Sequence, residues 1–125
     1  MRMADVRRDG LLALATLVGL VTVGTRLVGV APFVRPLAVM TGVGGALGIE
    51  WLFLASPALA AGWERRGVPV AGAVGVLVVA AVVAPRAPWL LGAATWGLVT
   101  YACLLGCVLV GWGNPVARLP TGRGR

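Results

Sequence analysis

Glu50 is the residue in this sequence best placed to do chemistry, because it is the only charged residue between Pro36 and Trp63. A charged side chain at the centre of a membrane-spanning helix costs roughly 2.5–3.5 kcal/mol on insertion scales. If this stretch crosses a bilayer, Glu50 needs a hydrogen-bonding partner, a proton or a cation. Such a carboxyl is typical of transport sites, and it also occurs as a hydrogen-bonded structural group.

The other residues offer little support for catalysis. The acids are Asp5, Asp9, Glu50 and Glu64, His and Lys are absent, and Ser56 is the only serine. No Ser/His or Cys/His pair can be built, and no two acids can be placed together around a metal. Two cysteines lie one helical turn apart, but without His or acidic neighbours they do not complete a metal site. We therefore predict a protein that is not an enzyme and that has no metal or cofactor.

The composition indicates lipid as the solvent of most of the chain. Of its 125 residues, 59% are hydrophobic and 12% are charged, and there are 19 glycines. Soluble domains have about 25% charged residues, and a soluble fold of this length cannot hide so much apolar surface. We expect one compact membrane domain with no soluble domain attached.

Four apolar runs separate the charged residues, and each is close to the roughly 20 residues that a membrane helix needs. They predict an all-α, four-helix transmembrane bundle with short turns and spans at about 10–31, 36–56, 68–84 and 89–112. The second run continues to Trp63, so its helix either is tilted or ends near Ser56-Pro57, with the remainder along the membrane interface. The basic start also resembles a signal peptide, but no Ala-x-Ala site follows Arg26, and we expect the segment to be retained.

The ends of the chain and its arginines predict the orientation. Residues 1–9 form a basic head and residues 113–125 a Gly/Arg tail, which we expect to be disordered. The head, the Arg65–Arg66 turn and the tail hold eight arginines, whereas the opposite loops hold at most three, Arg26, Arg35 and Arg86. The positive-inside rule then places both termini in the cytoplasm of a multi-pass protein of the cell membrane.

The arginines also indicate the partner. All eleven basic residues are Arg and the net charge is +7. They stand at the ends of the apolar runs, where they contact anionic lipid head groups. A nucleic-acid-binding protein would gather them on one face. We therefore predict the lipid bilayer, and not nucleic acid, as the partner of these charges.

Partners for Glu50 are predicted by depth. At 1.5 Å per helical residue, the polar residues at the depth of Glu50 include Thr16 on the first helix and Thr100 and Tyr101 on the fourth. We expect Glu50 to face the bundle interior and to accept a hydrogen bond from one of these hydroxyls.

Gly44 and Gly48 have the spacing that lets two helices approach closely. At 100° per residue they point about 120–160° away from Glu50. Their notch therefore faces either another helix of the chain or a second copy, and packing within the chain is the simpler expectation.

Two functions follow from these patterns. The first is a structural or accessory integral membrane protein that packs through small residues with itself, as a homo-oligomer, or with an unknown membrane partner. The alternative is a small transporter or channel subunit in which Glu50 binds a proton or cation.

Overall fold

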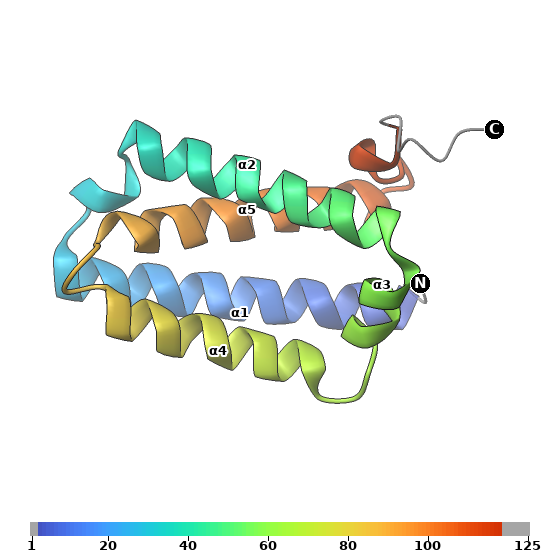
Figure 1. The fold of residues 1–125 in the computed structure, drawn as a ribbon, viewed down its shortest axis with the longest axis horizontal. Helices are drawn as coiled ribbons and strands as arrows, with labels where there is room; N and C mark the ends of the chain where they lie inside the picture. Colours follow the sequence, from blue (N-terminus) through green and yellow to red (C-terminus); the bar gives the residue numbers. More distant parts are fainter. Residues whose placement is uncertain (1–2, 119–125) are drawn as a thin grey trace.

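The computed structural model describes residues 3–118, which form an all-α chain, as predicted (Figure 1). The α-helices are α1 (Met3–Val28), α2 (Pro36–Ala55), α3 (Pro57–Trp63), α4 (Val68–Val83) and α5 (Trp89–Leu109). There are also two short 3-10 helices: η1 (Ala31–Phe33), between α1 and α2, and η2 (Pro115–Arg118), after α5. Proline is the first residue of α2 and of α3 and the second residue of α4. At these positions its missing N–H leaves no helical hydrogen bond unmade.

Within residues 3–118, α1, α2 and α5 are long and apolar enough to cross a membrane. The 16 residues of α4 extend only about 24 Å at 1.5 Å per residue, less than the roughly 30 Å of hydrocarbon. It qualifies only together with α3, from which it is bent by 85°. The fold thus contains three candidate spans, or four if the bent pair counts as one.

The second apolar run is divided between two helices. α2 ends at Ala55, and Ser56 caps α3 by accepting a hydrogen bond from the Leu59 N–H at 3.5 Å. Pro57 then begins α3, because proline fits the first turn of a helix but not its interior. This agrees with the alternative in which the helix ends near Ser56-Pro57, and not with one tilted helix to Trp63.

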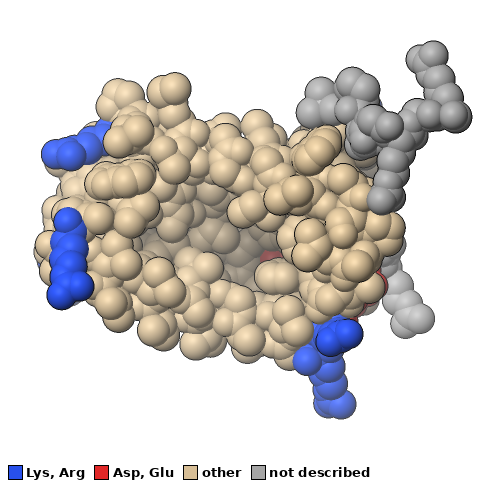
Figure 2. Space-filling view, viewed as in Figure 1, with Lys and Arg blue, Asp and Glu red and all other residues tan. Residues whose placement is uncertain are grey.

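The long helices follow one another in space in the order α2, α5, α1, α4 (Figure 1). α1 and α4 run in one direction, whereas α2 and α5 run in the other. Because α2 does not pack beside α1, the chain reaches it through η1, which crosses the start of α5. α2 and α4 are the outer members of the row, and Figure 2 shows a hollow between them on the face in view.

The closest helix contact joins α2 and α5 at Gly42. A Cβ atom on Gly42 would lie 2.8 Å from the Cβ of Trp96 and 2.9 Å from the backbone nitrogen of Gly97, so only glycine fits there. Nearby, the Trp96 indole N–H donates to the Phe33 carbonyl at 2.7 Å. This bond ties the η1 crossing to α5.

Most large apolar side chains of the described residues point outward rather than into a core. A buried cluster of Leu20, Phe33, Ala84 and Leu91 lies where η1 crosses α5. Figure 2 shows arginines toward the two ends of the molecule, with a broad and mostly uncharged band between them in which acidic atoms are visible only inside the hollow. Such a band between charged ends is the distribution that a bilayer requires.

The described residues of the head and part of the tail are helical. α1 begins at Met3, so the head continues the first helix instead of preceding it. The tail starts with η2, in which Val116 is 3% exposed, because the chain folds back onto α2 after α5. Residues 119–125 lie outside the described residues.

Candidate functional site

Two hydrogen-bonded pairs of polar side chains lie at one end of the molecule, where α1 begins and α2 and α5 end (Figure 1). The end cluster, as we call it, consists of Asp9 with Trp63 and of Glu50 with Asn114. The Tyr101 hydroxyl of α5 lies within electrostatic range of both carboxylates. The end cluster is the site that the structure offers for polar chemistry.

Asp9 is the more deeply buried of the two acids, at 3% exposure. One of its carboxylate oxygens accepts from Nε and Nη2 of Arg8, each at 3.1 Å, and the other accepts from the Trp63 indole N–H at 3.4 Å. A buried carboxylate needs such donors, because burial without them is costly. Asp9 was not among the predicted site residues, although it continues the buried stripe of Val6, Ala13 and Thr16 at helical spacing.

Trp63, at the end of α3, holds three other helices together. Its indole donates to Asp9 of α1, and its ring meets Phe53 of α2 edge to face, with the centroids 6.0 Å apart. A Cβ on Gly72 of α4 would lie 3.1 Å from the same ring, so α4 approaches it closely. Trp63 therefore fixes the bend between α3 and α4 against α1 and α2.

Glu50 accepts a hydrogen bond from the side-chain amide of Asn114, which follows α5. The side-chain oxygen Oδ1 of Asn114 accepts from the Val116 N–H at 3.0 Å, an arrangement that turns the side-chain N–H groups toward Glu50. The chain reaches this position through a Schellman turn, in which Gly111 has φ +85° and the Trp112 N–H donates to the Cys107 carbonyl at 2.9 Å.

The predicted hydroxyl partners of Glu50 are wrong. Thr16 donates to the Leu12 carbonyl at 2.7 Å, and Thr100 donates to the Trp96 carbonyl at 2.9 Å. Because a hydroxyl has one proton to donate, neither can also donate to Glu50. Tyr101 lies near Glu50, but no hydrogen bond joins them within residues 3–118. The prediction compared the depths of residues on the membrane helices only, and the partner of Glu50 lies in the segment that folds back after α5.

The prediction that Gly44 and Gly48 pack against another helix of the chain is also wrong. Both are exposed, and a Cβ on either would have no atom within 4 Å. Gly42 and Gly44 lie about 200° apart around the helix, so only one of them can face α5, and Gly42 does. The notch of Gly44 and Gly48 points away from the rest of the described chain.

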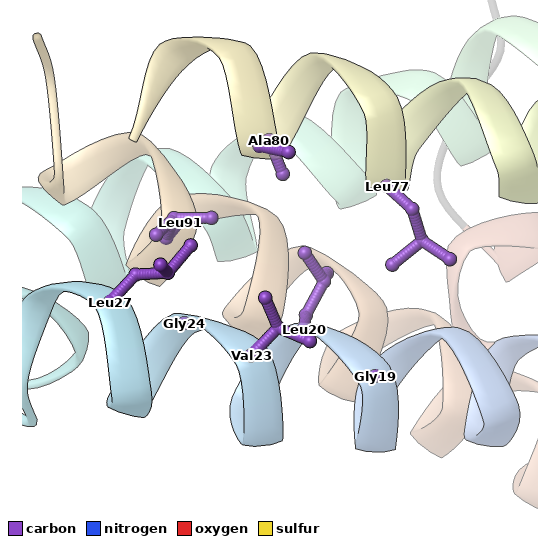
Figure 3. Close-up of a pocket in the computed structure, with 9 residues that line it drawn as sticks. Gly19, Leu20, Val23, Gly24, Leu27, Leu77, Ala80 and Leu91 are labelled. Carbon is purple, nitrogen blue, oxygen red and sulfur yellow. The ribbon is translucent and has the colours of Figure 1, made fainter. Parts of the chain in front are cut away.

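A separate apolar pocket of about 170 Å³ lies between α1, α4 and α5 (Figure 3). Leu77 and Ala80 of α4 point toward Leu20 and Val23 of α1, and Leu91 of α5 closes one end. Every side chain that lines this pocket is apolar, and Glu50 is not among them. The pocket thus has no polar connection to the end cluster.

Comparisons of the chain with known protein families, with curated proteins and with solved structures find no match. In the end cluster each carboxylate accepts from side chains of the chain itself. This arrangement can hold helices and the segment after α5 in place.

Proposed function

We propose that this chain is a small multi-pass integral membrane protein with a structural or accessory role, and not an enzyme. The observation that carries the proposal is the use of its polar groups. Asp9 and Glu50 bind donors that join separate elements, while the hydroxyls of Thr16 and Thr100 are engaged by their own helices. Within residues 3–118 no buried side-chain N or O atom lacks a hydrogen-bond partner. Such groups stabilise a fold without leaving a donor or acceptor for a substrate.

Four crossings in a bundle with both termini in the cytoplasm are part of this proposal. α1 begins and α5 ends at the same end of the molecule, as an even number of crossings requires (Figure 1). Arg7, Arg8, Arg65, Arg66 and Arg118 belong to this end, and Arg26, Arg35 and Arg86 to the other. The larger number of arginines at the first end supports a cytoplasmic location for that end. In this arrangement α3 lies along the interface, because it is bent by 85° from α4. α4 then crosses alone, and its length of about 24 Å requires local thinning of the bilayer.

Topology is tested with reporters fused after residue 118 and inserted in the Arg86 turn. We expect a cytoplasmic signal from the first and an external signal from the second. The same signal from both positions would contradict the four-span arrangement.

The role of Glu50 is tested by flux. Protein reconstituted into vesicles should conduct protons or monovalent cations no faster than empty vesicles, for the wild type and for Glu50→Gln alike. The transporter alternative requires wild-type flux that Glu50→Gln abolishes. That result would replace the accessory role with a transport role.

Self-association through the notch of Gly44 and Gly48 is the proposed mode of assembly. Its support is the open space at both glycines on the outer face of α2, since small residues let two helix backbones approach closely. Replacing both by Leu should abolish dimers on a sizing column in mild detergent, whereas the same change at Gly75 of α4, which is also exposed with open space, should not. Dimers that survive the double replacement would exclude this mode.

A further inference from the structure

We propose that the groove between α1 and α4 binds one acyl chain of an anionic phospholipid, whose head group is held by Arg26 and Arg86. The groove is the apolar pocket of Figure 3, which lies between α1, α4 and α5. The inference depends on the membrane location proposed above, but not on the accessory role. It assigns a lipid site on the side opposite the end cluster.

The groove is shaped for hydrocarbon that enters from the side. Its floor is buried, with Leu20 at 2% and Leu91 at 4% exposure, whereas Leu27 on its rim is 61% exposed. The space of about 170 Å³ is close to that of an apolar cavity of about 150 Å³ that stays dry and admits benzene. A groove of this size and lining, open to a bilayer, is filled by a segment of about six carbons and not by water.

Glycine creates the space on the α1 side. Gly19 and Gly24 both line the groove, and a Cβ on Gly19 would only reach ordinary contact with Leu77 of α4, at 3.5 Å. Of the two, only Gly19 faces α4, because a Cβ on Gly24 would lie 2.6 Å from the Phe33 ring of η1. The missing side chain at Gly19 therefore leaves room beside Leu77.

Charge identifies the head group. Arg26 directly precedes Leu27 of the rim, and Arg86 lies in the turn that follows α4, at the same end of the molecule. Neither arginine forms a salt bridge within residues 3–118, where the only bridged arginine is Arg8. All four acids of the chain belong to the other half of the molecule. Two arginines without a salt bridge, at the end of the molecule to which Leu27 of the rim belongs, complement a lipid with a phosphate and an apolar chain.

A second copy of the chain fits this groove less well. A helix with its side chains is about 10–12 Å across, far wider than a space that holds about six carbons. A copy with the same orientation in the membrane would also place its own Arg26 and Arg86 at the same depth. Lipid supplies both the narrow apolar segment and the missing negative charge.

Native mass spectrometry of the purified protein in mild detergent tests the proposal, with phosphatidylglycerol and phosphatidylcholine of identical acyl chains as probes. We expect the wild type to retain one phosphatidylglycerol in preference to phosphatidylcholine. Arg26→Gln and Arg86→Gln should each reduce this preference about fivefold, the effect of one arginine near an anionic surface. Arg35→Gln is the matched control, because Arg35 lies at the same end but precedes α2, at the far edge of the row.

Filling the groove tests the acyl chain separately. Ala81→Phe on the exposed rim should lower retention of both lipids at least tenfold, whereas Ala71→Phe, on an exposed face of the same helix outside the groove, should not. Equal retention by the two variants, equal effects of Arg35→Gln and Arg86→Gln, or a wild-type dimer lost in Ala81→Phe would each overturn the proposal. Failure of membrane insertion is recognised independently, because the protein would then be absent from the membrane fraction.

Discussion

Gly42→Ala should destabilise the protein more than any other glycine-to-alanine change in α2. The added Cβ would lie 2.8 Å from the Trp96 Cβ and 2.9 Å from the Gly97 nitrogen, so α2 and α5 must separate. Overpacking of this kind typically costs about 1–3 kcal/mol. Alanine also favours a helix over glycine by up to about 1 kcal/mol, and this gain opposes the loss.

Gly44→Ala is the matched control, because it gives the same helix-propensity gain with no atom within 4 Å of the new methyl group. The difference between the two variants therefore isolates the packing loss, which we expect to be about 1–3 kcal/mol. Gly97→Ala should fall between them, since its Cβ would meet the Gly42 carbonyl oxygen at 3.4 Å.

The measurement is reversible unfolding in mixed micelles with increasing SDS, compared as free energies of unfolding. If Gly42→Ala and Gly44→Ala unfold with the same free energy, α2 and α5 do not meet at Gly42 and the proposed packing is refuted. A loss for Gly97→Ala larger than that for Gly42→Ala would place the closest contact elsewhere.

Two further predictions concern the end cluster. Asn114→Ala removes both the donor to Glu50 and the acceptor of the Val116 N–H. The amide hydrogens of residues 116–118 should therefore exchange at least roughly tenfold faster, the effect of losing one hydrogen bond to a charged group. Glu50→Gln keeps an acceptor oxygen for Asn114 and should leave that exchange nearly unchanged; equally fast exchange in both variants would show that the contact depends on charge alone. Trp63→Phe keeps the ring but leaves Asp9 with one donor fewer, and we expect a loss of about 1–3 kcal/mol in the free energy of unfolding. An unchanged stability would mean that the indole N–H does not bind Asp9.

Much of the helical architecture could be predicted from the pattern of apolar runs and punctuating prolines. The predicted starts at Pro36, Val68 and Trp89 coincide with those of α2, α4 and α5, because proline and charged residues interrupt a membrane helix locally. The shortness of α4 was also visible in the spacing between its flanking turns. Its 85° bend from α3 was not, because Trp63 sets that bend partly by its contact with Asp9, which is far away in the sequence.

The contacts of Glu50 were predicted less well than the helices, because its partner does not lie on a helix. Placing Glu50 beside Thr16 and Thr100 assumed that partners share a depth and lie on helices. Its partner, Asn114, instead follows a turn made by Gly111 and Gly113, both with positive φ. Such a turn can be expected at glycine, but the direction in which the next residues fold depends on the surface that receives them.

Local chemistry in the sequence therefore determined which segments are helical, where α2, α4 and α5 begin, and that most of the helix surface is apolar. These properties depend on neighbours within a few residues along the chain. The tertiary structure alone decided that Gly42 and not Gly44 faces α5, that Asp9 is buried, and that a groove remains between α1 and α4. Each of these depends on which helix lies beside which, and that order follows from packing between residues distant in the sequence.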